Sequence, residues 1–123
     1  MSGFPHAHLS DGRVVTWRVP PGPAPCAVDA ELSTQPPPSA LAARLALDHP
    51  PAFWAAWTRL EVYCKLLDVP VLVGLHRYGR STALPPPGVH AVRVERHDGI
   101  TLAWGIGRPG ASAAHTRREC TRE

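Results

Sequence analysis

Lysine is almost absent from this sequence, since 12 of its 13 basic residues are arginine and Lys65 alone is lysine. Long apolar runs are also missing, because no stretch reaches the roughly 18–20 residues of a membrane span. Residues 1–10 contain no basic segment followed by a long apolar stretch, which is the pattern of a secretory signal. These absences predict a cytoplasmic protein that does not enter a membrane.

Cysteine and clustered positive charge are scarce as well. The three cysteines form no CxxC pair, which argues against a zinc site or a disulfide framework and favours a reducing compartment. The net charge of +3 suits a phosphate-bearing partner, although an arginine-rich surface produces the same charge without any partner. The arginines are scattered rather than set among aromatic residues in a stripe, so we expect no nucleic-acid partner.

The length of 123 residues leaves room for one domain, and 44% hydrophobic residues suffice for one modest core. We expect this domain to span residues 1–107. The small, polar residues 108–123 are expected to form a flexible C-terminal tail. The 15 prolines are mostly clustered and divide the chain into short elements.

Local patterns predict an α+β fold in which a small antiparallel sheet packs on one principal helix. The clearest signal is an apolar series at spacings of four and three, which indicates one face of a helix over 51–67. A His-Asp-Gly sequence at 97–99 indicates a hairpin that joins strands 89–95 and 100–106. Residues 1–10 are expected to be loose. Further strands are expected over 13–19, 26–32 and 69–75, and a shorter helix over 39–47.

Two carboxylates on the strand at 26–32 are candidates for chemistry. Asp29 and Glu31 are two positions apart, so both point to one face of the strand, while their neighbours point toward a core. Carboxylates this close repel each other unless water or a cation separates them, and their oxygens suit Mg²⁺. An ordinary half-exposed strand with a polar outer face explains the same pattern.

The principal helix carries a second group of candidates. Trp57, Glu61 and Lys65 follow at intervals of four, in one row beside the apolar seam. A surface Glu–Lys pair explains this row with little energetic consequence. However, arginine would serve such a pair equally well, and lysine provides a compact charge for phosphate.

Together these residues resemble the 4′-phosphopantetheinyl transferase superfamily, in particular the C-terminal half of its surfactin-synthetase-activating type. That type carries G-[VI]-D-[VIL]-E on a strand and W-x-x-K-E-x-x-x-K on a later helix. Residues 27–31 here read AVDAE, and residues 57–65 read WTRLEVYCK. Upstream, residues 8–15 are a looser counterpart of the Ser-His-Ser element of the family.

The resemblance implies that the chain folds like one half of such an enzyme. It implies transfer of the 4′-phosphopantetheine arm from coenzyme A to a serine of an acyl or peptidyl carrier protein. By match, Asp29, Glu31 and Glu61 would hold Mg²⁺, and Glu61 would assist deprotonation of the carrier serine. Lys65 would bind phosphate and stabilise the departing adenosine bisphosphate, and His8 would lie near the nucleotide phosphates.

The chain departs from the family pattern in size and at one lysine. It matches only half of a two-halved enzyme, and Leu60 stands where the motif has a lysine before the catalytic glutamate. Three possibilities follow from the resemblance: an active homo-oligomer, one half of a split enzyme completed by a partner chain, or a degenerate relative that acts as a binding or assembly module. An unrelated small α+β protein with coincidental spacings is the remaining alternative.

Overall fold

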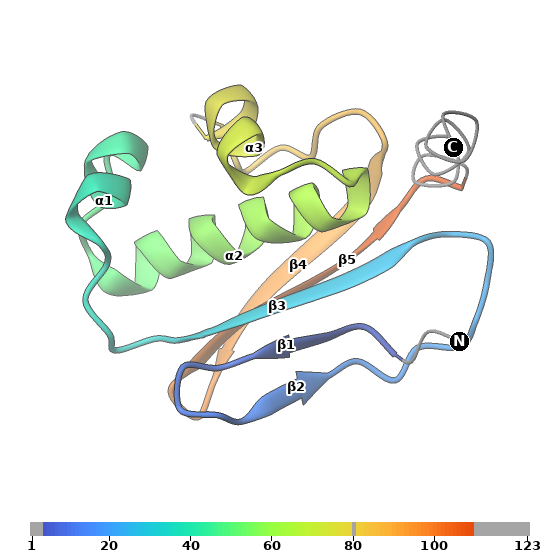
Figure 1. The fold of residues 1–123 in the computed structure, drawn as a ribbon, viewed down its shortest axis with the longest axis horizontal. Coiled ribbons are helices and arrows are strands. Elements are labelled where there is room, and N and C mark those ends of the chain that lie inside the picture. Colours follow the sequence, from blue (N-terminus) through green and yellow to red (C-terminus); the bar gives the residue numbers. More distant parts are fainter. Residues whose placement is uncertain (1–3, 80, 110–123) are drawn as a thin grey trace, which may run out of the picture.

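The computed structural model describes residues 4–79 and 81–109. Residues 110–123, which form most of the expected tail, lie outside the described residues. Figure 1 shows the order of the elements along the chain. They are β1 (His6–His8), β2 (Val14–Thr16), β3 (Cys26–Leu32), α1 (Ser39–Leu45), α2 (Pro50–Leu67), α3 (Val71–Tyr78), β4 (Val89–His97) and β5 (Ile100–Gly107).

The central feature is an antiparallel sheet of three strands in the order β3-β5-β4. The β4–β5 connection is the tight hairpin predicted from the sequence, with His97 opposite Ile100. Its two turn residues, Asp98 and Gly99, have φ values of 50° and 76°. Two consecutive positive φ values characterise the type I′ turn, whose twist matches that of the flanking strands.

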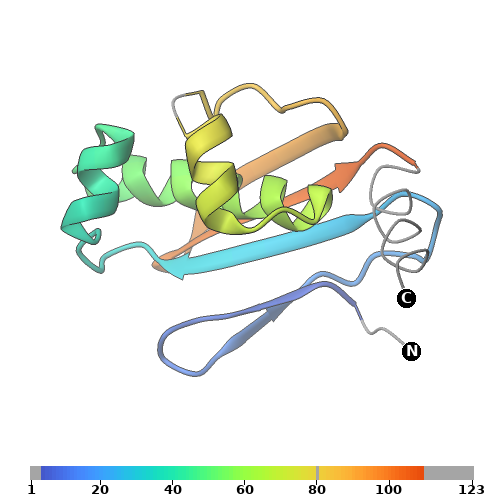
Figure 2. The same cartoon turned by 45° about the horizontal axis from the view of Figure 1, so that its top comes forward.

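Different layers cover the two faces of this sheet. Helix α2 crosses one face, and the β1–β2 hairpin lies against the other (Figures 1 and 2). Successive side chains of β3 point to opposite faces of the sheet, so the strand contributes to both layers. Ala27 faces a core shared with α2, whereas Val28 and Ala30 face a core shared with β1. The predicted α+β class with a small antiparallel sheet is therefore confirmed, with two sheets and three helices among the described residues.

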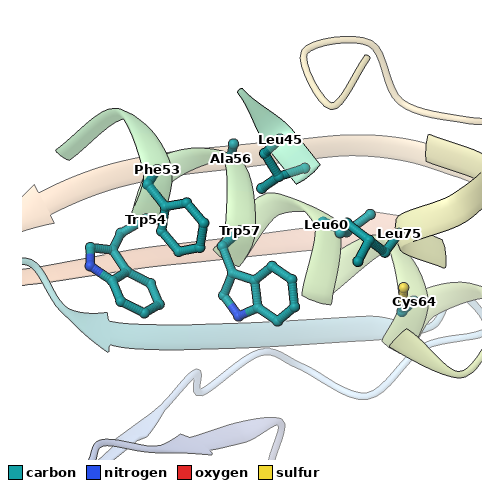
Figure 3. Close-up of a cluster of buried hydrophobic side chains, with 8 residues drawn as sticks. All are labelled: Leu45, Phe53, Trp54, Ala56, Trp57, Leu60, Cys64 and Leu75. Carbon is teal, nitrogen blue, oxygen red and sulfur yellow. The ribbon is translucent and has the colours of Figure 1, made fainter. Parts of the chain in front are cut away.

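Helix α2 starts with two prolines, a residue type favoured in the first helical turn because its missing N–H would have no helical partner there. The helix ends at Leu67, and the next residue, Asp68, takes the left-handed conformation. Along one side, Phe53 and Trp57 stack with ring centroids 6.2 Å apart. Figure 3 shows the cluster that they form with Leu45 of α1, Leu75 of α3 and further residues of α2, namely Trp54, Ala56, Leu60 and Cys64.

The expected strand at 69–75 is wrong, because the chain forms α3 there after Pro70. The apolar run has the right composition for either element, and its contact with α2 decides between them. Gly74 lies against Cys64 so closely that an added side-chain carbon would overlap the sulfur. This close approach allows a short helix to pack on α2.

The N-terminal expectations also need correction. Residues 6–8, which were expected to be loose, pair with β2, and the strand expected over 13–19 is limited to Val14–Thr16. The first helix ends at Leu45 rather than at 47, because Ala46 takes a left-handed conformation with φ of 56°. None of the helices in the described part of the chain has both the length and the apolar character of a membrane span.

Candidate functional site

Strand β3 points Asp29 and Glu31 toward the face of the sheet that α2 covers. The register shows this, because Asp29 lies opposite Ala103 of β5, a residue of the core shared with α2. Asp29 is only 8% exposed, whereas Glu31 is half-buried. The alternative of an ordinary strand with a polar, solvated face therefore does not describe Asp29.

Helix α2 brings Lys65 to the same place. Its Nζ donates a hydrogen bond to the carbonyl oxygen of Val28 at 2.8 Å and lies 3.5 Å from Oδ1 of Asp29. Glu61 lies one helical turn earlier and is half-buried. The two segments that carry the family-like motifs are thus adjacent, and their charged residues form one group: Asp29, Glu31, Glu61 and Lys65, here called the β3–α2 cluster.

Burial and mutual repulsion determine the protonation of this cluster. Burial raises the pKa of Asp29 to about 7, with further increases from the charges of Glu61 and Glu31, while Lys65 opposes the shift. The pKa of Glu31 is raised, chiefly by burial and also by Glu61. Burial likewise raises the pKa of Glu61, and Lys65 counteracts this effect. Since Glu61 and Glu31 both affect Asp29, the three carboxylates lie within electrostatic reach of one another.

One oxygen of the cluster has no protein partner. Oδ2 of Asp29 is buried and makes no hydrogen bond among the described residues. A buried carboxylate oxygen without a partner is costly, so it favours a proton or a cation at this position. Carboxylate oxygens suit Mg²⁺, and in this respect the donor set fits the ion. However, no group of three His, Cys, Asp or Glu side chains within 4–79 and 81–109 is arranged to hold a metal ion.

His8, the other predicted binding residue, is not brought to the cluster. It lies on β1 beyond the opposite face of the sheet, where its neighbours Ala7 and Leu9 point inward and its own side chain is exposed. Its ring contacts His6 edge-on, with centroids 5.5 Å apart. Trp57 likewise does not join the charged group, because it packs with Phe53 in the core beneath α1 and α3.

Gln35 contacts the cluster although sequence analysis did not identify it. Its Nε2 donates to Oε1 of Glu31 at 3.2 Å, and its backbone carbonyl accepts a hydrogen bond from Nε1 of Trp54 at 2.9 Å. The α2 tryptophan thereby holds the loop after β3 in place, and the glutamine side chain covers one side of Glu31. No local pattern marks this residue, since its position depends on the path of a proline-rich loop.

Comparisons of the chain with protein-family models, with curated proteins and with solved structures give no match. A proposed function therefore depends on the geometry of the β3–α2 cluster together with the resemblance in sequence.

Proposed function

We propose that this chain is a phosphopantetheinyl-transferase-like protein that acts on coenzyme A and a carrier protein. The observation that carries the proposal is the convergence of two separate motifs. Asp29 and Glu31 on β3 lie beside Glu61 and Lys65 on α2, with an unpartnered carboxylate oxygen between the segments. In a member of the family the two motifs must lie side by side to form one site. In an unrelated chain with coincidental spacings, nothing requires the two segments to be adjacent.

In this proposal Asp29, Glu31 and Glu61 are the residues that would hold Mg²⁺, and their side chains would have to move together to do so, because the described residues hold no three such groups in an arrangement for a metal ion. The ion would neutralise charge on the coenzyme A pyrophosphate, which is the principal requirement of phosphoryl transfer. Lys65, whose side chain is 39% exposed, is accessible from outside and can exchange its contact with Asp29 for a phosphate oxygen. Such an exchange would release Asp29 for the ion.

The transfer itself requires a base and a stabilised leaving group. The serine oxygen of the carrier forms a bond to the phosphorus of the phosphopantetheine arm, and the bond from that phosphorus to the adenosine bisphosphate breaks. Glu61 accepts the serine proton, directly or through water, and burial, which raises its pKa, makes it a stronger base than an exposed glutamate. Lys65 stabilises the negative charge on the departing bisphosphate.

The same contacts support a second candidate, a non-catalytic binding or assembly module that keeps the fold. Lys65 already neutralises Asp29 and ties α2 to β3 through the Val28 carbonyl, which is a structural role. Leu60, at the position where the family motif has lysine, is fully buried in the apolar cluster. In either candidate, a second copy or a partner chain would supply the missing half of the coenzyme A site.

The deciding experiment is modification of carrier proteins in the presence of coenzyme A and Mg²⁺. Intact mass spectrometry of a panel of apo carriers should show the gain of one phosphopantetheine arm. Glu61→Gln and Asp29→Asn should abolish the gain. Asp98→Asn is the matched control, because it removes one negative charge from an exposed turn residue that is not among the charges shifting the pKa of the cluster carboxylates, and it should leave the gain intact.

Calorimetric titration with coenzyme A separates the two candidates. Binding that requires Mg²⁺ and is lost in Asp29→Asn, without modification of any carrier, would support the non-catalytic module. Absence of coenzyme A binding, or binding that ignores both cluster substitutions, would overturn the proposal as a whole.

A further inference from the structure

A second feature lies on the opposite side of the sheet, between the β1–β2 hairpin, which packs on β3, and the neighbouring strands β5 and β4. An open hollow of about 300 Å³ lies there between the hairpin and the face of the sheet that points away from α2. Trp17, just after β2, forms one wall, and Trp104 of β5 forms another. Both indoles are half-buried, and both pack against the core that β3 shares with β1.

The floor of the hollow is apolar and its rim is acidic. Val28 and Leu102 line the base, and Glu95 of β4 lies opposite Leu102 in the register of β4 and β5. The Glu95 side chain is exposed, and among the described residues it makes no ion pair or side-chain hydrogen bond. The hollow therefore combines two indole rings with one carboxylate that has no ion-pair partner within 4–79 and 81–109.

We propose that this hollow binds an organic ammonium group, either on a small molecule or on a methylated lysine side chain. Indole faces attract cations through their ring quadrupole, and a nearby carboxylate adds direct attraction. The apolar base favours methyl groups on the nitrogen over a bare, strongly hydrated ammonium. The volume is at the lower end of the range of about 300–1,000 Å³ for ligand pockets, so it suits a compact group.

Arg93 is a positive charge beside the hollow that opposes a bound cation. It lies opposite Trp104 in the register, on the same face of the sheet as Glu95, but it does not line the hollow. Its positive charge should weaken the binding of a cation and leave a neutral ligand unaffected. Substitution of Glu95 should therefore weaken the binding of a cation, whereas substitution of Arg93 should strengthen it.

The test is a titration of the full chain with choline, followed through the indole N–H signals in two-dimensional NMR spectra. We expect saturable shifts of the Trp17 and Trp104 signals, while Trp54 and Trp57, which lie in the core beneath α1 and α3, stay in place. The uncharged isostere 3,3-dimethylbutan-1-ol should bind about three- to thirtyfold more weakly than choline. A short peptide with one trimethylated lysine, titrated in parallel, distinguishes the two sources of the group.

Charge variants complete the test. Glu95→Gln should weaken choline binding at least about threefold, and Arg93→Gln should strengthen it. Asp98→Asn, which removes a carboxylate from the turn of the same hairpin, should leave the affinity unchanged. All three positions are exposed, so the spectra should keep their native dispersion. Equal binding of choline and its neutral isostere, or no saturation by either choline or the peptide, would overturn the proposal.

Discussion

Lys65 of α2 lies 3.5 Å from Oδ1 of Asp29 and donates to the carbonyl of the preceding residue, so one side chain ties the principal helix to an edge strand of the sheet. The pair sits at the point where the two motif-bearing segments meet. It serves the fold in both candidate functions, and its behaviour can be measured without knowledge of a substrate.

Replacement of Lys65 by methionine should destabilise the protein at pH 8. The change leaves a buried carboxylate without its cation and a carbonyl without its donor. Because the lysine is 39% exposed, we expect a loss of only about 1–2 kcal/mol in the free energy of unfolding, measured with urea. At pH 5, where Asp29 is largely protonated, the loss should be smaller. An equal loss at both pH values would show that the ion pair is not its cause.

The stability of the wild-type protein should fall as the pH rises from about 4 to about 7. The pKa of Asp29 is raised to about 7 in the folded state, so over this range the folded state holds a proton that the unfolded state has released. Stability is then greatest at the acid end and declines by at most about 1.4 kcal/mol per pH unit for this group. Urea unfolding at a series of pH values, in the presence of a chelator, measures the slope.

Asp29→Asn should remove the contribution of Asp29 to the decline of stability with rising pH. It should also raise the free energy of unfolding at pH 8. The amide keeps the shape of the carboxyl group and cannot ionise. A more stable variant that has lost Mg²⁺-dependent binding of coenzyme A would separate a functional role of Asp29 from a structural one. An unchanged slope in this variant would contradict the assignment of the titration to Asp29.

Gly74→Ala should destabilise the packing of α3 on α2. The new methyl group would overlap Sγ of Cys64, so α3 must move away from α2. Overpacking of this kind costs about 1–3 kcal/mol. Cys64→Ala should restore much of the loss in the double variant, and a thermodynamic cycle of the four proteins measures the coupling. Additive effects would show that the two side chains do not meet.

Cys64 should resist alkylation in the folded protein. Burial, assisted by the charge of Glu61, raises the pKa of this thiol to about 11. Because the thiolate is the reactive form, iodoacetamide at pH 8 should modify Cys64 at least about a hundredfold more slowly than in urea-unfolded protein. Peptide mapping by mass spectrometry assigns the modified sites. Rapid labelling of Cys64 without denaturant would contradict the contact between α2 and α3.

Sequence patterns predicted those elements whose causes are local. The four-three spacing of apolar residues from Phe53 to Leu67 predicted α2, since neighbouring turns of a helix share one face. The His97-Asp98-Gly99 sequence predicted the β4–β5 hairpin, because its turn needs positive φ at residues that tolerate it. The apolar run at 69–75 failed as a strand, because its composition suits both elements and only its contact with α2 decides between them.

The sequence by itself determined that Asp29 and Glu31 share one face of β3, and that Glu61 and Lys65 share one side of α2, because these relations follow from the periods of strand and helix. Only the tertiary structure decided that the two pairs meet and that Asp29 is buried. Burial depends on what covers each face of the strand, and β3 is covered by α2 on one face and by the β1–β2 hairpin on the other. The same arrangement decided that His8 lies apart from the cluster, and that Trp17, Trp104 and Glu95 meet around a hollow that no local pattern predicts.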